Sequence, residues 1–405
     1  MDRASTTRRT LLKGTAMVAA GTALPGAAAL AQSAPAAAKG PKLLEMDGKA
    51  KLAVLGDRPL VAETQASLMD DDVTPTDKLF IRNNGQVPEM AANPKAWKIR
   101  IDGEVNTPLE ITLGDLMGRF ENVTYQLMLE CGGNGRSFFT PEARGNQWTN
   151  GGAGCPQWTG VRLADVLKAA GPKPSAVYTG HYGADPTLAG ETDKPTISRG
   201  MRLEKAMDPH TLIAFKLNGK DLPLIHGGPV RLVVPGWAGS LSTKWLTRIW
   251  IRDKEHDGQG MGGFSYRTPK KPIVPGSKGD ANDMAILEAM PVRSVITFPA
   301  DGSKISGRKI ELRGHAWSGN SEIKTVEVSI DNGATWMPAK VNAPANKFAW
   351  QRFTATVDLP STGYYEVLSR ATDAAGKTQP FAAVNWNPQG YGANPVTPVR
   401  ILAES

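Results

Sequence analysis

The chain has 405 residues, of which 40% are hydrophobic, and it contains 43 glycines and 30 prolines. The length allows two or three domains, and the composition is typical of a globular, loop-rich protein with many strands. The net charge is +8, and no long run of Lys or Arg stands out. This argues against nucleic acid as a partner, and it is compatible with a small anionic substrate or an acidic protein.

Residues 1–31 have the pattern of an export signal. The segment 6–13, TTRRTLLK, contains a twin-arginine signature, and an alanine-rich apolar run follows it to residue 30. Ala29-Leu30-Ala31 fits a cleavage site, so we expect the mature chain to start near Gln32. The apolar run is too short and too rich in small residues for a membrane anchor, and no later segment predicts a membrane span. We therefore expect export in the folded state to the periplasm.

The residues after the signal predict an arm followed by a domain of mixed strands and helices. Residues 32–74 begin rich in alanine and proline, and we interpret them as an extended arm or linker. The range 78–82 predicts a short strand, and Asn83-Asn84-Gly85 predicts a turn. Apolar and charged residues alternate over 96–101, which predicts a half-buried strand.

Two helices are predicted by their apolar periodicity. Thr112 and Asp115 form a capping box before an apolar face over residues 113–120. Residues 163–170 repeat the same spacing, and Gly171-Pro172 ends the second helix. Both faces are expected to lie in the core and to carry no chemistry.

Both cysteines lie in a glycine-rich stretch, residues 130–160. Cys131 opens a loop of small residues, and glycine lets the backbone approach a bound group closely. Arg136 and Arg144 follow it, and nearby positive charge favours the thiolate, which binds metals and attacks electrophiles. An exported chain with two cysteines could instead form a Cys131–Cys155 disulfide. Cysteine counting leaves these two interpretations open.

Three further stretches place polar residues where chemistry could occur. Residues 226–236, HGGPVRLVVPG, are followed by Lys244-Trp245-Leu246. Arg231 lies inside an apolar strand, so it predicts either a buried salt bridge or a contact to an anion. The segment 177–200 is long and polar, which by default indicates a solvated loop. Tyr266 lies in a further glycine-rich loop and could donate a hydrogen bond without adding negative charge.

The C-terminal part has a different texture. Residues 270–283 are rich in Pro, Gly and Lys and predict a linker. Beyond them, apolar and polar residues alternate over 326–330, and Asn332-Gly333 predicts a hairpin turn. Recurring short strands predict an all-β, immunoglobulin-like sandwich over residues 284–405.

These motifs together resemble the sulfite oxidase family of molybdenum enzymes. The stretches that carry the resemblance are CGGNGRS (131–137), RGNQWT (144–149), WTGVRLADVL (158–167), HGGPVRLVVPG (226–236), RGHAWSG (313–319) and SIDNGATW (329–336). The resemblance implies an α+β fold, with a sulfite-oxidase-type mixed molybdopterin domain followed by an immunoglobulin-like dimerisation domain. We place the molybdenum–molybdopterin domain at residues 75–280 and the dimerisation domain at 284–405.

The resemblance also assigns site residues. It makes Cys131 the protein's one ligand to molybdenum and leaves Cys155 a free, partly buried thiol. It implies that the catalytic and substrate-binding residues are Cys131, Arg82, Arg136, Arg144 and Tyr266. It implies that the cofactor contacts are Asn83, Asn84, Asp185, His226, Arg231, Ser242, Thr243 and Lys244. Asn84 stands where many relatives have histidine, and Gln389 stands where animal sulfite oxidases carry an arginine.

The implied activity is oxidation of sulfite to sulfate. The chain contains no Cys-x-x-Cys-His haem motif, so we expect electrons to leave to a separate c-type cytochrome. One alternative keeps the cofactor but oxidises protein-bound sulfane sulfur or reduces a sulfoxide. Another is a non-enzymatic exported scaffold with a disulfide, because sandwich domains alone imply no function. A homodimer is expected from the family and from the prevalence of two-fold oligomers.

Overall fold

Two large sheets and three short helices form the centre of the first domain in the computed structural model, which describes residues 40–405. The predicted export signal, residues 1–31, lies outside the described residues. The first sheet has the order β11-β10-β15-β4-β5, and β15 and β4 are parallel while the other pairs are antiparallel. Its strands are β4 (Lys98–Gly103), β5 (Leu109–Thr112), β10 (Tyr178–Gly183), β11 (Ser198–Arg202) and β15 (Leu246–Arg252).

The second sheet has the order β13-β12-β9-β6, and β14 also pairs with β12. Its strands are β6 (Asn122–Gln126), β9 (Gln157–Arg162), β12 (Leu212–Leu217), β13 (Lys220–Asp221) and β14 (Arg231–Val233). The helices are α1 (Leu113–Arg119), α2 (Leu163–Ala170) and α3 (Leu203–Ala206). A common apolar core joins these helices to the sheets, and Ile99, Leu116, Val166, Ile213 and Ile249 within it are fully buried.

The predicted helices form because their ends are capped and their apolar faces are buried. Thr112 caps α1, and its hydroxyl accepts from the Asp115 N–H at 3.1 Å. Gly171 ends α2 in the left-handed conformation with φ 65°, where residues other than glycine are strained. The alternation predicted over 96–101 is also confirmed, since Ile99 and Ile101 on β4 are buried while Lys98 and Arg100 are exposed.

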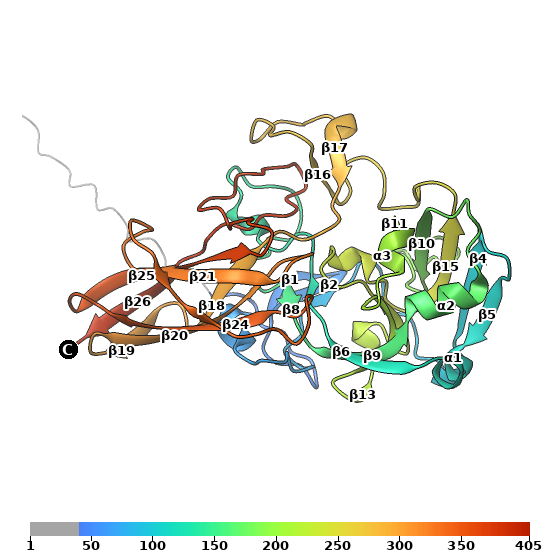
Figure 1. The fold of residues 1–405 in the computed structure, drawn as a ribbon, viewed down its shortest axis with the longest axis horizontal. Helices are drawn as coiled ribbons and strands as arrows, with labels where there is room; N and C mark the ends of the chain where they lie inside the picture. Colours follow the sequence, from blue (N-terminus) through green and yellow to red (C-terminus); the bar gives the residue numbers. More distant parts are fainter. Residues whose placement is uncertain (1–39) are drawn as a thin grey trace, which may run out of the picture. The chain divides into compact units, whose positions relative to one another are not determined.

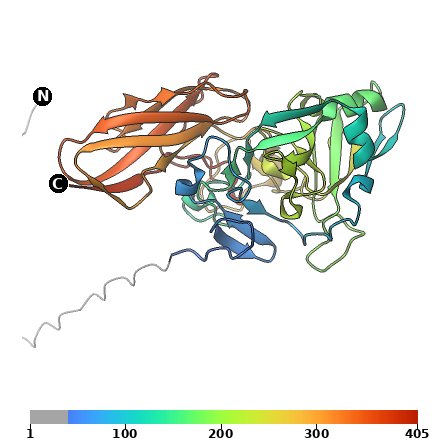
Figure 2. The same ribbon diagram turned by 90° about the horizontal axis from the view of Figure 1, so that it is seen from below.

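The sequence-based interpretation of residues 32–74 as an extended arm is corrected by the structure. Residues 53–63 form a hairpin of β1 (Ala53–Asp57) and β2 (Leu60–Glu63), and β3 (Ile81–Arg82) pairs with β2. This blue sheet is visible in Figure 2. The strands are too short to show a clear alternation of apolar and polar residues. Tertiary contacts hold this segment in place, such as the hydrogen bond from the Thr64 N–H to the Gly151 carbonyl at 3.0 Å.

The predicted linker at 270–283 is the loop of a two-stranded ladder. β16 (Arg267–Pro269) pairs antiparallel with β17 (Met284–Ile286). Shorter elements complete the chain: β7 (Leu129–Glu130), β8 (Ala153–Gly154), and the 3₁₀ turns η1 (Ala66–Met69), η2 (Pro94–Ala96), η3 (Arg136–Phe138), η4 (Leu224–His226), η5 (Gly239–Leu241) and η6 (Ala281–Asp283). No helix in residues 40–405 combines the length and the apolar character that crossing a membrane requires.

The C-terminal residues form a second, β-rich domain, drawn in orange and red in Figure 1. One sheet has the order β18-β20-β24-β23, and the other has the order β19-β26-β25-β21-β22. An apolar cluster that includes Leu312, Val328, Phe353 and Val367 joins strands of both sheets. The predicted hairpin is confirmed, since Asn332 and Gly333 have positive φ between β21 and β22. The strands are β18 (Arg293–Phe298), β19 (Ser303–Ser306), β20 (Lys309–Trp317), β21 (Ile323–Ser329), β22 (Met337–Pro338), β23 (Lys340–Val341), β24 (Gln351–Asp358), β25 (Gly363–Asp373) and β26 (Val399–Glu404).

Candidate active site

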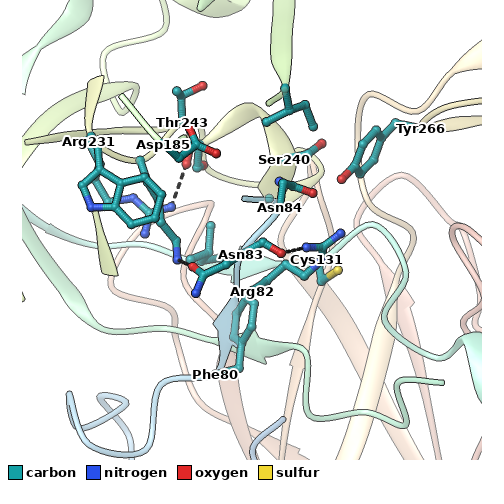
Figure 3. A pocket seen from close by; sticks show the side chains of 16 residues that line it. Phe80, Arg82, Asn83, Asn84, Cys131, Asp185, Arg231, Ser240, Thr243 and Tyr266 are labelled. Carbon is teal, nitrogen blue, oxygen red and sulfur yellow. Dashed lines mark hydrogen bonds between the residues drawn. The ribbon is translucent and has the colours of Figure 1, made fainter. Parts of the chain in front are cut away.

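A cavity in the first domain gathers most of the predicted site residues. It encloses about 710 Å³ of space, its open mouth included. Ten of the thirteen predicted side chains line it, although they come from segments up to 184 residues apart in the chain: Arg82, Asn83, Asn84, Cys131, Asp185, Arg231, Ser242, Thr243, Lys244 and Tyr266. Figure 3 shows these side chains converging on one space. The prediction that these segments meet is therefore supported by the geometry.

Cys131 is presented to this cavity by a tight loop. It follows β7, and its N–H donates to the Gly152 carbonyl at 2.8 Å. Gly152 has no room for a side chain, because a Cβ there would lie 2.9 Å from Trp148 and 3.3 Å from the Cys131 Cβ. The Cys131 thiol is partly exposed and free. A soft sulfur ligand is thus held open to whatever fills the cavity.

The disulfide alternative is wrong, because both cysteines are free. Cys155 is fully buried rather than partly buried. It packs against Trp350, whose backbone N–H donates to the Cys155 sulfur at an N–S distance of 3.5 Å. Burial raises the pKa of the Cys155 thiol to about 12. It therefore stays a neutral, inert thiol at neutral pH.

Two cations at the cavity have only neutral hydrogen-bond partners in the described part of the chain. Arg231 donates to the carbonyls of His226 and Ser242, both at 2.7 Å. Lys244 donates to Asn83 Oδ1 at 2.6 Å and to the Ile225 carbonyl at 2.8 Å. Burial lowers the pKa of Arg231 to about 9 and the pKa of Lys244 well below its ordinary value. Buried charge without a counter-charge is costly, so an anion in the cavity would stabilise both.

Other polar groups at the cavity are available to a ligand. Within residues 40–405, the Ser240 hydroxyl is buried without a hydrogen-bond partner, and Ser240 lies in the turn η5 at the cavity wall. Arg82 donates to the Asn83 carbonyl and also faces the cavity. Burial raises the pKa of Asp185 to about 6, although Lys244 opposes that rise. The cavity thus offers cations, amides and hydroxyls around one thiol.

Three predicted residues do not line the cavity. His226 is buried behind it, and its Nε2 lies 3.2 Å from Lys49 Nζ. Arg136 donates to the carbonyls of Gln389 and Asn146, both at 2.8 Å, so it braces the Cys131 loop from behind. Arg144 is exposed, and its backbone N–H donates to the Pro388 carbonyl at 3.1 Å. Their predicted roles as direct contacts stay predictions.

A buried network that the sequence interpretation missed holds the base of the Cys131 loop. Glu130 Oε1 accepts from Arg293 Nε at 3.1 Å and from the Asn134 amide at 2.9 Å, and Trp317 Nε1 donates to Glu130 Oε2 at 2.7 Å. The Asn134 Oδ1 in turn accepts from the Gly152 N–H at 3.0 Å. A charged residue opening the apolar strand 293–298 was the available signal, because such a residue needs a buried partner.

Lys49 is a second missed residue. It lies in the segment interpreted as an arm, and its ammonium donates to the carbonyls of Thr76 and Leu79 at 2.8 and 2.7 Å as well as approaching His226. Burial lowers the pKa of Lys49 to about 8, and its charge helps to lower the pKa of His226. His226 is therefore neutral at neutral pH and can accept a hydrogen bond from Lys49.

Comparison with known proteins agrees with this geometry. Residues 84–260 match the oxidoreductase molybdopterin binding domain, and residues 284–404 match the Mo-co oxidoreductase dimerisation domain. The chain is 32% identical over 356 residues to sulfite oxidase of Gallus gallus, covering 84% of this chain and 75% of that protein. The chain belongs to the sulfite oxidase family.

Other members of the wider group match over most of this chain. It is 31% identical over 363 residues to mitochondrial sulfite oxidase of Homo sapiens, covering 85% of this chain but 64% of that protein. It is 32% identical to the NADH nitrate reductase of Ulva prolifera, covering 82% of this chain and 40% of that protein. Its fold matches the sulfane dehydrogenase SoxCD from Paracoccus pantotrophus with a TM-score of 0.70 and 29% identity, covering 84% and 83% of the two chains.

The family's molybdenum–molybdopterin cofactor fits the residues at the cavity. A pterin phosphate would provide the anion that Arg231 and Lys244 lack, and the unpartnered Ser240 hydroxyl could donate to it. The free Cys131 thiol would provide the soft protein ligand that molybdenum accepts. The chain is accordingly a molybdopterin oxidoreductase with a sulfite-oxidase-type fold and a second, β-rich domain.

Proposed function

We propose that the chain oxidises sulfite to sulfate and passes the electrons to a separate c-type cytochrome. The single observation that carries this proposal is the cavity in which one free thiol, Cys131, shares the wall with Arg82 and other cations that lack carboxylate partners. Such a site favours a small dianion beside a soft metal ligand. The relatedness to sulfite oxidases supports sulfite as that dianion.

The chain's own residues would bind, orient and shield the substrate. The Arg82 guanidinium presents a planar fork of donors that suits an oxyanion. The Tyr266 hydroxyl adds a donor without adding negative charge. Asn83 links the two ends of the site, because its amide oxygen accepts from Lys244 while its carbonyl accepts from Arg82. When bound, the molybdenum cofactor supplies oxygen-atom transfer to sulfur and accepts two electrons.

Further parts of the proposal concern domains and location. We infer that residues 75–280 and 284–405 act as the catalytic and dimerisation domains, and that the second is an immunoglobulin-like sandwich. The two facing sheets and the match to a dimerisation domain support this. We also infer that the enzyme works in the periplasm, which the twin-arginine signature at residues 6–13 supports.

A second candidate is oxidation of protein-bound sulfane sulfur. The structural match to a sulfane dehydrogenase at a TM-score of 0.70 favours it. Gln389 in place of a substrate arginine is compatible with it, because a less positive site tolerates a less charged substrate. A sulfoxide reductase with the same cofactor has no such structural support here.

Substrate comparison on the purified holoenzyme tests these candidates. Sulfite and a protein-bound persulfide are compared at equal concentration with ferricyanide as the electron acceptor. Dimethyl sulfoxide is tested at the same concentration with a reduced viologen as the electron donor. Sulfite is expected to be turned over at least about tenfold better than the others by kcat/KM, with sulfate as product. Preferential oxidation of the persulfide would replace the first candidate by the second.

A further inference from the structure

Arg199 is a buried cation beside the cavity that the proposed function does not use. It lies on β11 and is 1% exposed. Its Nη1 donates to the Gly260 carbonyl at 2.5 Å and contacts the Met261 sulfur at 3.1 Å, and neither partner is acidic. Its Nε and Nη2 are buried and have no hydrogen-bond partner among the residues that the structure describes. Burial lowers the pKa of Arg199, so the fold retains this charge at a cost in free energy.

The Arg199 guanidinium lies at one end of a stack of aromatic rings that reaches the Cys131 loop. Its Cζ lies 4.6 Å from the centre of the Tyr266 ring. Tyr266 stacks on Tyr391 with centroids 5.0 Å apart and an interplanar angle of 19°. Arg136 covers the Tyr391 ring at 5.4 Å. The two tyrosines therefore lie in one stack with a cation packed against each ring.

Tyr266 is the member of this stack that faces the cavity. Its ring lies against the Cys131 loop, since a Cβ on Gly132 would be 3.5 Å from its Cδ1. Figure 3 shows its hydroxyl directed into the cavity. Tyr266 has a φ of 49°, a left-handed conformation that is unfavourable for a bulky residue. Such strain at a cavity persists only where the surroundings hold the residue in place.

We propose that Arg199 is a positioning residue that acts through Tyr266. Arg199 packs against one face of the Tyr266 ring and holds the ring in place. As a cation without an acidic partner, it also makes the Tyr266 hydroxyl a stronger hydrogen-bond donor to a sulfur oxyanion in the cavity. A cation over an aromatic face draws electron density from the ring, which strengthens the ring's hydroxyl as a hydrogen-bond donor. This inference rests on the proposed function, because it takes an oxyanion of sulfur as the ligand.

The test is a double-mutant cycle on the affinity of the holoenzyme for inorganic sulfate, measured by isothermal titration calorimetry. Arg199→Gln and Tyr266→Phe are each expected to weaken binding about tenfold, as for loss of a charge-assisted hydrogen bond. The double variant is expected to bind no more than about twofold more weakly than either single variant, because both changes remove one interaction. Unchanged affinity in Arg199→Gln, or additive losses of about a hundredfold, would overturn the proposal.

Two further variants secure the result. Arg202→Gln changes an exposed arginine on the same strand, paired with Glu288, and should bind sulfate as the parent does. Arg199→Lys keeps the charge without the planar stack and is expected to lose about threefold. If Arg199→Gln does not yield folded holoenzyme, the cycle is run with Arg199→Lys, and an additive result there overturns the proposal equally.

Sulfate binding needs no turnover, so the two proposals can fail separately. If the losses of sulfate affinity are not additive but the enzyme does not oxidise sulfite, the proposed function is refuted and the role of Arg199 stands. If the enzyme oxidises sulfite normally and the losses of sulfate affinity are additive, only the role of Arg199 is refuted. A parent enzyme that binds no sulfate would also contradict this inference, whatever its activity.

Discussion

The two cysteines show how the environment decides what one residue type can do. Cys131 is open to the cavity on a loop that glycines keep narrow, whereas Cys155 is sealed in an apolar cluster with its pKa raised to about 12. The first can therefore reach a metal in the cavity, whereas the second stays a neutral thiol at neutral pH. The sequence predicted this difference through motif resemblance, because cysteine counting could not separate a ligand from a disulfide partner.

A matched pair of variants tests this difference. Cys131→Ser is expected to lower sulfite turnover at least about a hundredfold while leaving thermal unfolding nearly unchanged, because a hydroxyl is a poor ligand for a soft metal. Cys155→Ala should do the opposite, with the free energy of unfolding falling by about 1–2 kcal/mol and activity per folded molecule unchanged. Steady-state kinetics and denaturant titration of both variants check this. Normal turnover in Cys131→Ser would refute the ligand assignment.

Asp185 predicts a pH-dependent stability of the metal-free protein. Its pKa is raised from 3.8 to about 6, mainly by burial. The folded state therefore holds this proton more tightly than the unfolded chain, and the carboxyl lowers stability as the pH rises from about 4 to about 6. Asp185→Asn should raise the free energy of unfolding by about 2 kcal/mol at about pH 8 and by much less at about pH 4.

Urea titration of the metal-free parent and variant at both pH values measures this effect. Asp208→Asn is the control with the opposite sign. Burial acts to raise the pKa of Asp208, but hydrogen bonds from His210 and the charges of two lysines together outweigh it and hold that pKa below its ordinary value. That variant should be less stable than the parent at about pH 8. An Asp185→Asn variant that gains nothing at about pH 8 would show that the carboxyl is better solvated than the structure indicates.

At the scale of elements, the Cys131 loop depends on a strand from the other domain. Arg293 at the start of β18 is fully buried and pairs with Glu130, the residue before Cys131, at 3.1 Å. It also donates to Asn150 Oδ1 at 2.9 Å and to the Asn134 carbonyl at 3.1 Å. The second, β-rich domain therefore helps to position the loop that carries Cys131.

Arg293→Met should destabilise the protein by about 3–5 kcal/mol, because it leaves the Glu130 carboxylate buried without its charged partner. Molybdenum content should fall with it, since the loop that presents Cys131 loses its support. Arg308→Met is the control, because Arg308 is exposed and its side chain donates to the Pro360 carbonyl at 3.0 Å; its effect should stay within about 0.5 kcal/mol. Thermal unfolding and metal analysis measure both variants. A stable, fully loaded Arg293→Met protein would contradict this role.

Local signals predicted the elements that local physics determines. The Thr112 cap, the Gly171 helix end and the Asn332-Gly333 turn are each fixed by a few adjacent residues, and the structure confirms all three. The β1–β2 hairpin and the Glu130–Arg293 pair were missed. The hairpin is short and is held by tertiary contacts, and the pair joins residues 163 positions apart, so neither leaves a local pattern.

The site residues, like the elements, were predicted where a local motif identifies them and missed where contacts join distant segments. Motif resemblance identified ten side chains that line the cavity. It could not show that His226 is bound to Lys49 behind the cavity, or that Arg199 packs on Tyr266, because those contacts depend on packing between distant segments. Neither Lys49 nor Arg199 stands in a motif that the sequence alone would single out.

At the scale of the whole molecule, residues 284–404 match a dimerisation domain, which supports a homodimer. The purified protein is therefore expected to have about twice the mass of one chain, since two-fold symmetric dimers are the commonest assembly. Size-exclusion chromatography with light scattering measures this directly. A protein that stays monomeric across the micromolar range would contradict the homodimer.

The most direct test of sulfite oxidation is to measure sulfite-dependent reduction of cytochrome c and molybdenum content in the same sample of purified protein. We expect about one molybdenum per chain, sulfate as the product, and about two cytochromes reduced for each sulfite consumed, because the oxidation releases two electrons. Activity should be absent in Cys131→Ser. Protein that contains a full complement of molybdenum but reduces no acceptor with sulfite would contradict sulfite as the substrate.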